Sequence, residues 1–252
     1  MNSPTPTARI QPYIPGKFDT LIEGLEYAAK GNSGFNFFTG KGELKSVLTF
    51  TELRDRAIDM AHRLVGITET GDRIGICAVT SPDFAVMFFA CQYAGLIPAP
   101  LPLPVTLGGR GSYERQLQRM ADTGDFSALL TPKSMENIMS SALNDHDVPV
   151  ISFEDVELLP KQDFLRPHKA DGPCYIQYSS GSSSSPKGVI GTQASVTANC
   201  FGQIGPGGLQ ITEADRCTSW LPLYHDMGLV GFMITPVTVS YTHLTLPTTP
   251  YV

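Results

Sequence analysis

The residues best suited to chemistry form a run of small polar side chains at positions 179–188. This run reads SSGSSSSPKG and ends in a lysine between a proline and a glycine. Gly181 permits a positive φ, and consecutive backbone N–H groups in such turns form a concavity that binds anions. The serine hydroxyls add hydrogen-bond donors, and Lys187 adds a compact positive charge. This combination predicts a loop that binds polyphosphate.

A flexible linker is the other interpretation of residues 179–188, because runs of serine and glycine pack poorly and often join domains. Two observations weigh against it. The flanking segments CYIQY and GVIGT both have the composition of β-strands, and their separation is typical of a hairpin. A tether also has no need of the stiff Pro186 and the charged Lys187. We therefore favour the phosphate-binding interpretation.

The same run fails as a Walker A loop. The pattern G-x-x-x-x-G-K-[ST] can start at Gly181, which puts Lys187 in register. However, Pro186 then stands where the second glycine belongs, and Gly188 stands where the hydroxyl that binds Mg²⁺ belongs. The loop also lies between two predicted strands, whereas a Walker A loop opens a helix.

A second cluster of chemically capable residues lies downstream, in the segment SWLPLYHDMGLVG at 219–231. A single histidine such as His225 is more often a hydrogen-bonded structural residue than a catalyst. The pair His225-Asp226 is a weak hint of metal binding, but no second group of ligands supports it, so no metal site is predicted. Asp226 either caps the apolar helix predicted at 227–237 or contacts a ligand, and the sequence leaves both roles open.

The elements that must position these residues alternate between helices and short apolar strands. This alternation predicts an α/β fold with largely parallel sheets covered by helices. Capping pairs, apolar periodicity and glycine stops predict helices at 18–31, 48–66, 81–95, 112–124 and 192–204. Apolar β-rich runs predict strands at 72–79, 126–131, 148–152, 174–178, 188–192 and 216–221.

Composition excludes several classes of protein. The formal charge is −6 with no run of basic residues, which argues against a sequence-independent nucleic-acid binder. The five cysteines are scattered and form no C-x-x-C pair, so we expect reduced thiols and a cytoplasmic location. The most apolar stretch, 84–105, holds four prolines in its second half, which excludes a membrane-spanning helix.

Three regions are expected along the chain. Residues 1–17 are predicted to be a disordered N-terminus, and residues 18–239 are predicted to form one incomplete α/β domain. The composition changes at the boundary between 239 and 240, where SYTHLTLPTTPYV begins. We expect residues 240–252 to be either a non-native tail or an ordinary disordered terminus.

The serine-rich run resembles the phosphate-binding loop of the adenylate-forming superfamily, whose signature is close to [YF]-T-S-G-[ST]-T-G-x-P-K-G. The match covers residues 178–188, with Ser184 in place of a glycine. The resemblance implies that the following residues bind the phosphates of ATP: Ser179, Ser180, Gly181, Ser182, Ser183, Ser184, Lys187 and Gly188. Gln193 departs from the pattern, since many relatives have a histidine there.

The segment from Trp220 to Leu229 is similar to the corresponding motif of fatty-acyl-AMP ligases in particular. In that family the residue at the position of His225 lies near the reacting carboxylate, and the helix after it lines the acyl tunnel. The resemblance therefore implies a catalytic role for His225. It also implies substrate contacts for His225, Asp226, Met227 and Gly228.

The implied reaction joins a fatty acid to ATP, with Mg²⁺, and yields an acyl-adenylate and pyrophosphate. The acyl group then passes to the thiol of an acyl carrier protein or of a polyketide synthase carrier domain. A long-chain acyl-CoA synthetase and a nucleotide-binding module without activity are the alternatives. Downstream of the serine-rich run, neither the family's Y-G-x-T-E motif nor its T-G-D motif occurs in the sequence. We therefore expect an N-terminal fragment, inactive alone, of an adenylate-forming enzyme.

Overall fold

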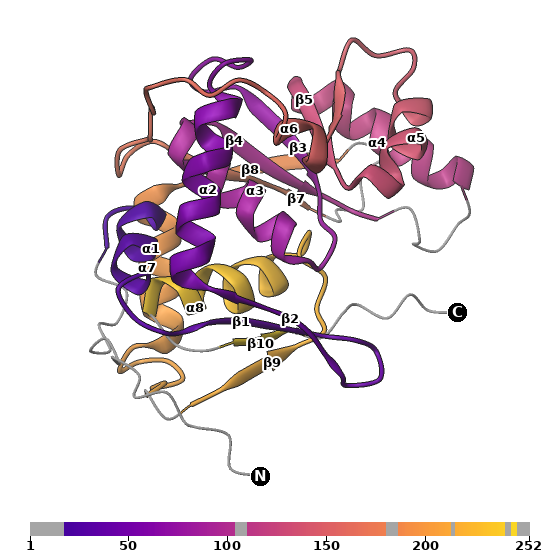
Figure 1. The fold of residues 1–252 in the computed structure, drawn as a ribbon. Coiled ribbons are helices and arrows are strands. Elements are labelled where there is room, and N and C mark those ends of the chain that lie inside the picture. The colour runs from indigo at the N-terminus through magenta and orange to yellow at the C-terminus, as the bar shows by residue number, and fades with distance from the viewer. Residues whose placement is uncertain (1–17, 104–109, 180–185, 213–214, 240–242, 246–252) are drawn as a thin grey trace.

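The computed structural model describes residues 18–103, 110–179, 186–212, 215–239 and 243–245 (Figure 1). The strands are β1 (Gly34–Phe38), β2 (Leu44–Thr49), β3 (Arg73–Cys77), β4 (Ile97–Leu101), β5 (Phe126–Thr131), β6 (Val150–Ser152), β7 (Pro173–Ser179), β8 (Lys187–Thr192), β9 (Cys217–Ser219) and β10 (His243–Thr245). The helices are α1 (Leu21–Ala28), α2 (Phe50–Leu64), α3 (Pro82–Ala94), α4 (Arg110–Gly124), α5 (Lys133–Ala142), α6 (Phe153–Val156), α7 (Gln193–Ile204), the π-helix η1 (Met227–Ile234) and α8 (Thr235–Val239).

The described strands form three sheets. One has the order β4-β3-β5-β6, and every pair in it is parallel. A second has the order β2-β1-β10-β9, in which only the β1–β2 hairpin is antiparallel. The third is the antiparallel pair β7-β8. The prediction of an α/β fold with largely parallel sheets is confirmed.

Helices α2, α3 and α8 lie between two of these sheets (Figure 1). They share one large core with Phe35 of β1, Leu48 of β2 and Ile76 of β3. Helices α4 and α5 pack on the opposite face of the β4-β3-β5-β6 sheet, where Leu117 and Met139 form a second core. Burying both faces of the parallel sheet explains why its strands are continuously apolar in sequence.

The predicted helix starts follow from local side-chain caps. The Thr20, Thr49 and Ser81 hydroxyls each accept a hydrogen bond from the backbone N–H three residues later. Such caps satisfy N–H groups that have no partner inside the helix. At the other end of α3, Gly95 has φ 69°, the left-handed conformation that ends a helix and favours glycine.

Several elements were not predicted. The β1–β2 hairpin and helix α5 lack the signals used above, and α5 begins after Pro132 without any side-chain cap. Strand β10 lies in the segment expected to be a terminal tail, and it pairs in parallel with both β1 and β9. The rest of 240–252 and all of 1–17 lie outside the described residues, so the predicted disorder of residues 1–17 and the proposed boundary at 239 stay predictions.

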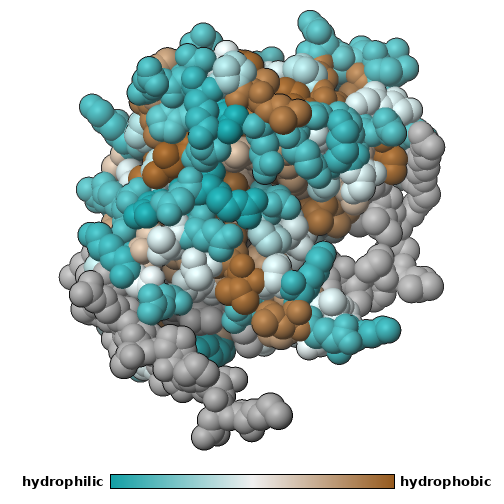
Figure 2. Space-filling view, viewed as in Figure 1, coloured by the Kyte–Doolittle hydropathy of each residue, from teal (hydrophilic) through white to brown (hydrophobic). Residues whose placement is uncertain are grey.

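Figure 2 shows that one face of the molecule is covered mostly by hydrophilic residues, with apolar residues in small patches between them. Among the helices that the structure describes, none is long and apolar enough to cross a membrane.

Candidate active site

The serine-rich run joins two strands of one antiparallel hairpin, as the sequence predicted. Strands β7 and β8 pair from Tyr175 opposite Gly191 to Ser179 opposite Lys187. The hairpin therefore closes at the two ends of the predicted phosphate loop. Residues 180–185, which include the predicted ligands Ser180, Gly181, Ser182, Ser183 and Ser184, lie outside the described residues.

Lys187 and Gly188 form the described end of this loop. Lys187 is exposed and has no ion-pair partner among the residues that the structure describes. A Cβ at Gly188 would lie 2.8 Å from the Cγ2 atom of Ile176. Glycine at position 188 therefore allows β8 to pack closely on β7. Because Lys187 is exposed and has no ion-pair partner among the described residues, its ammonium group is available for a ligand.

One hydrogen bond holds the two predicted motifs side by side. The Gln177 side chain on β7 donates from Nε2 to the carbonyl oxygen of Tyr224 at 2.7 Å. These residues are 47 positions apart in the chain. Gln177 lies two positions before the serine-rich run, and Tyr224 directly precedes His225. The bond therefore places the segment from 220 to 229 beside the entrance to the phosphate loop.

His225 and Asp226 interact with each other at the start of η1. His225 Nδ1 lies 2.6 Å from Asp226 Oδ1, and both side chains are more than half exposed. Asp226 Oδ1 also accepts a hydrogen bond of 2.7 Å from the backbone N–H of Met227. Of the two roles left open for Asp226, the cap is therefore present, and the residue also lines the pocket described below.

Gly228 is required by the close turn that precedes η1. A Cβ on this residue would collide with the backbone carbonyl of Pro222. That carbonyl also accepts a hydrogen bond of 3.2 Å from the N–H of His225, which closes the turn. Gly228 is buried, so its role in the structure is to let this turn pack against the helix.

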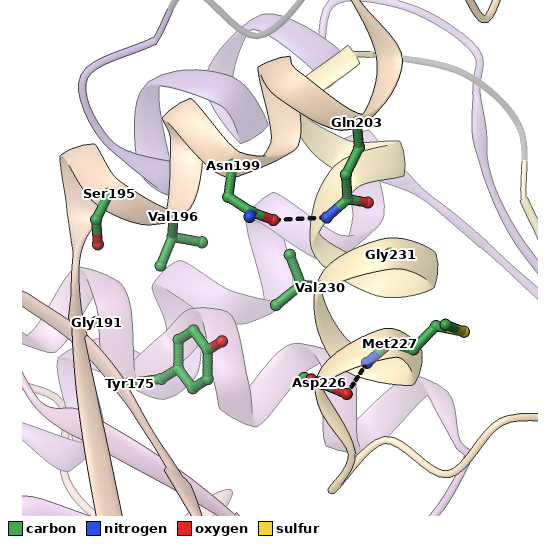
Figure 3. A pocket seen from close by; sticks show the side chains of 10 residues that line it. All are labelled: Tyr175, Gly191, Ser195, Val196, Asn199, Gln203, Asp226, Met227, Val230 and Gly231. Carbon is green, nitrogen blue, oxygen red and sulfur yellow. Dashed lines mark hydrogen bonds between the residues drawn. The ribbon is translucent and has the colours of Figure 1, made fainter. Parts of the chain in front are cut away.

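A pocket of about 470 Å³ lies between the hairpin, α7 and η1 (Figure 3). Its apolar walls come from Val196 on α7 and Val230 on η1. The complete lining is Tyr175, Gly191, Ser195, Val196, Asn199, Gln203, Asp226, Met227, Val230 and Gly231. Of the predicted substrate contacts, Asp226 and Met227 line this pocket. His225 and Gly228 are not in the lining, but each is next in the chain to a residue that is: His225 to Asp226, and Gly228 to Met227.

Most of the pocket lining was missed by sequence reasoning. Ser195, Asn199 and Gln203 recur at intervals of four residues along α7, which places them on one helical face. This polar line next to a predicted phosphate loop is a signal that could have found them. Tyr175 and Gly191 carry no such signal, because their place in the pocket depends on the pairing of β7 with β8.

A buried polar network positions α7, and with it the wall of the pocket. Gln193 Nε2 donates to Gln92 Oε1 at 2.7 Å and to the Pro173 carbonyl at 3.2 Å. Its Oε1 accepts from the N–H of Leu21 at 3.1 Å, and Gln92 Nε2 donates to the Cys174 carbonyl at 2.9 Å. Buried amides with all these partners hold the helix in one orientation. This is the structural role of Gln193, which stands where many relatives have a histidine.

The described ranges assemble no group of metal ligands, and two of their cysteines, Cys77 and Cys91, are buried. His, Cys, Asp and Glu side chains form no group of three there that could hold a metal ion. Burial raises the pKa of the Cys77 thiol to about 12, and burial also raises the pKa of Cys91. These two thiols are therefore protonated at neutral pH, and they belong to the core.

The chain is similar to known proteins over most of its length. A model of the AMP-binding enzyme family matches residues 25–251. A Caulobacter vibrioides protein, provisionally named an acyl-CoA synthetase, is 38% identical over 98% of this chain and 43% of its own length. The long-chain-fatty-acid–AMP ligase FadD28 of Mycobacterium tuberculosis is 29% identical over 77% of this chain and 34% of its own length.

A solved structure of a fatty acyl-adenylate ligase, from work on the E. coli and L. pneumophila enzymes, has the same fold. Its TM-score is 0.91 at 37% identity, over 95% of this chain and 44% of that chain. The chain thus spans less than half the length of the relatives that it matches. The resemblance predicted from the two motifs is confirmed, and the chain belongs to the AMP-binding family of adenylate-forming enzymes.

Proposed function

We propose that the chain is the part of a fatty-acyl-AMP ligase that binds ATP phosphates and the acyl substrate. The enzyme would convert a fatty acid and ATP to an acyl-adenylate and pyrophosphate, and then pass the acyl group to the thiol of a carrier protein. The observation that carries the proposal is the 2.7 Å hydrogen bond from Gln177 to Tyr224, which sets the phosphate-loop hairpin beside the motif of His225. We also propose a cytoplasmic location.

The proposed reaction needs no general base. A fatty acid with a reference pKa of roughly 4 to 5 is already ionised at neutral pH and can attack the α-phosphorus of ATP. The barrier comes from bringing one anion to another, so positioning and charge neutralisation are what the protein must supply. Residues 179–188 would hold the β- and γ-phosphates, with Lys187 as the positive charge. His225 would orient the attacking carboxylate.

Mg²⁺ is proposed to arrive with the nucleotide. The pocket lining offers one carboxylate, Asp226, and it already accepts a hydrogen bond from the backbone N–H of Met227. The residues present therefore do not form a metal site by themselves. A Mg²⁺ ion bound through the phosphates would share their negative charge, as in other phosphoryl-transfer enzymes.

The pocket is proposed to take the acyl chain. It lies directly beside the Asp226 end of η1, and Val196, Val230 and the stem of Met227 form apolar walls of the kind that ligand pockets use. An acyl chain in this space would place its carboxylate toward the His225 turn and the hairpin. The names of FadD28 and of the solved ligase favour a fatty acid as substrate.

An acyl-CoA synthetase is the second candidate, because the Caulobacter vibrioides relative carries that name. The two activities differ only in the acceptor thiol. Supplying CoA or a phosphopantetheinylated carrier protein to the enzyme and measuring which one becomes acylated decides between them. Acylation of CoA alone would overturn the carrier-protein proposal.

We propose that these 252 residues bind ligands but are inactive by themselves, since the chain spans 44% of the solved relative. Fatty-acid-dependent exchange of pyrophosphate into ATP measures the adenylation step directly. We expect negligible exchange by this chain. Exchange at the rate of a complete ligase would contradict the proposal of an inactive part.

Binding of Mg-ATP tests the phosphate loop in this chain. Replacing Lys187 by alanine removes the charge proposed to hold the phosphates, and hydrogen bonds to charged groups are worth about 1.5–3 kcal/mol. We expect Lys187→Ala to weaken Mg-ATP binding at least about tenfold in isothermal titration calorimetry. Lys45→Ala, an exposed lysine on β2, is the matched control and should bind normally. Equal affinity of both variants would exclude Lys187 from the phosphate site.

A further inference from the structure

Tyr175 is a polar residue in the apolar part of the pocket. Its ring packs against Phe88 of α3 with centroids 6.3 Å apart, and the residue is only 8% exposed. Figure 3 shows its hydroxyl pointing across the pocket toward η1, on the side of Val230. Burial raises the pKa of Tyr175, so the hydroxyl stays neutral and keeps its proton at neutral pH.

The opposite strand leaves the Tyr175 ring uncovered. Tyr175 pairs with Gly191 across the hairpin. A Cβ at Gly191 would lie 3.9 Å from the ring atom Cε1 of Tyr175 and 3.1 Å from Cγ2 of Val196. A larger side chain at this position would grow into the space between these two residues. Glycine there keeps the floor of the pocket open to a ligand.

The Tyr175 hydroxyl has no hydrogen-bond partner among the residues that the structure describes. Its neighbours in the pocket lining include Val196 and Val230, whose side chains offer none. An unsubstituted alkyl chain over this hydroxyl would displace water and leave the group unpaired, which is unfavourable. A ligand with an oxygen atom at this point would satisfy it.

Asn199 supplies a second donor on the other side of the pocket. Its Oδ1 accepts a hydrogen bond of 2.6 Å from Gln203 Nε2, as Figure 3 shows. This bond orients the side chain and leaves the NH₂ group of Asn199 to donate elsewhere. Tyr175 and Asn199 therefore present two neutral donors to one space, which suits an oxygen that accepts hydrogen bonds.

The charge of the pocket narrows the class of ligand further. The Asp226 carboxylate lies in the lining, and no Lys or Arg side chain does. A second carboxylate on the acyl chain would be repelled by Asp226 and would find no cation in this lining. A neutral oxygen, as in a hydroxyl or an oxo group, is not repelled by Asp226 and needs no cation.

We propose that Tyr175, assisted by Asn199, selects an acyl chain that carries a neutral oxygen substituent, so that the natural substrate is a hydroxy or oxo fatty acid. This inference rests on the proposed function, in which the pocket holds the acyl chain. Tyr175 is a specificity residue in this proposal, and it takes no part in the attack on ATP.

Binding to the 252-residue chain tests the inference without turnover. Dodecanoate and a set of monohydroxydodecanoates that differ in the position of the hydroxyl are titrated, with Mg-ATP present, against the chain and its variants. We expect at least one hydroxy acid to bind about threefold to tenfold more tightly than dodecanoate, the effect of one net hydrogen bond. Tyr175→Phe should abolish that preference while the affinity for dodecanoate stays the same or rises.

Two further variants separate recognition from folding. Asn199→Ala changes an exposed helix position and should lower the same preference without changing the melting temperature of the chain. Tyr93→Phe is the matched control, because it removes a buried hydroxyl that is bonded to Glu26 at 2.6 Å, on α3 and outside the pocket lining. It should leave the preference unchanged.

The possible outcomes distinguish the two proposals. If all acids bind equally, and Tyr175→Phe and Asn199→Ala have no effect, the inference about the oxygen substituent is wrong while a fatty-acid pocket stands. If a hydroxy acid is preferred and Tyr93→Phe removes the preference as fully as Tyr175→Phe does, the effect is structural and the inference is again wrong. If neither dodecanoate nor any hydroxy acid binds, the proposed fatty-acid site fails and this inference fails with it.

Discussion

Helices α3 and η1 are both strongly apolar, but α3 is buried on all sides, whereas one side of η1 borders a pocket. Every residue of α3 from Phe84 to Ala94 is buried, so neighbours surround the helix on all sides. In η1, Leu229, Met233 and Ile234 face the core, whereas Val230 and Gly231 line the pocket and Met227 is 60% exposed. An apolar helix in the sequence can therefore belong to the core or form the wall of a pocket, and composition alone does not distinguish these two places.

The two helices also differ in how they begin and wind. Helix α3 starts at a serine in extended conformation and ends at a left-handed glycine. Helix η1 starts at Asp226, whose backbone is already helical, and the N–H of Thr235 after it bonds to the carbonyl of Val230, five residues back. Single-turn π segments are often found at functional sites. The wider winding of η1, which runs for eight residues, accompanies its place beside the pocket.

The largest expected difference between the two helices is in the loss of unfolding free energy when one of their side chains is truncated to alanine. Phe89→Ala in α3 removes a fully buried ring that contacts Phe88, and such changes cost about 3–5 kcal/mol of unfolding free energy. Met227→Ala in η1 removes an exposed side chain, and we expect a change within about 0.5 kcal/mol. Urea unfolding of both variants measures this difference. Equal losses would mean that η1 is a core helix like α3.

Two glycines of η1, Gly228 and Gly231, are expected to differ in how much stability is lost when each is replaced by alanine. Gly228→Ala puts a methyl group against the Pro222 carbonyl, and we expect a loss of about 2–3 kcal/mol because the backbone must shift. Gly231→Ala puts its methyl 3.7 Å from Gln203 Oε1 and 3.9 Å from Met227 Cγ, which are ordinary contacts. We expect the stability of this variant to change by less than about 1 kcal/mol, since alanine favours helix. Thermal unfolding of the two variants tests the distinction, and a reversed order would refute it.

The cap of α3 is expected to have an intermediate effect. The Ser81 hydroxyl accepts a hydrogen bond of 3.2 Å from the N–H of Phe84. We expect Ser81→Ala to lower the unfolding free energy by about 1 kcal/mol, and Ser81→Gly to lower it by only a few tenths. Denaturant midpoints measure both. If the two variants are equally stable, the hydroxyl does not act as a cap.

The smallest expected effect is a pH dependence of the unfolding free energy. It comes from His168, in the loop that packs on the end of α3. Burial lowers the pKa of His168, and a hydrogen bond with the backbone of Gly95 opposes this in part. The folded chain then holds this proton less tightly than the unfolded chain does. Stability from this group is present above roughly pH 6.5 and is lost as the pH falls through the folded pKa.

His168→Gln is the control for this pH effect. We expect it to remove a pH-dependent contribution below about 1 kcal/mol from the unfolding free energy between pH 7 and 5. Unfolding curves of the two proteins across this range give the difference directly. If the curves run parallel, His168 does not titrate with folding.

Local signals in the sequence decided much of the fold. Each of these signals affects the conformation of residues only a few positions away in the chain. They are the threonine and serine caps, the left-handed Gly95 and the apolar runs of β3 and β5. For that reason the helix starts and the alternation of strands and helices could be predicted. The hairpin around the serine-rich run was predictable for the same reason, because its two strands are neighbours in the chain.

Only the tertiary structure decided the site. The bond from Gln177 to Tyr224 and the pocket with Tyr175 on its floor join segments that are far apart in the chain. Strand β10 likewise has weak local signals and is held by pairing with β1 and β9. Such contacts depend on how packed layers are placed relative to one another, and no short stretch of sequence carries that information. The sequence by itself therefore determined the family, while packing determined which side chains line the pocket.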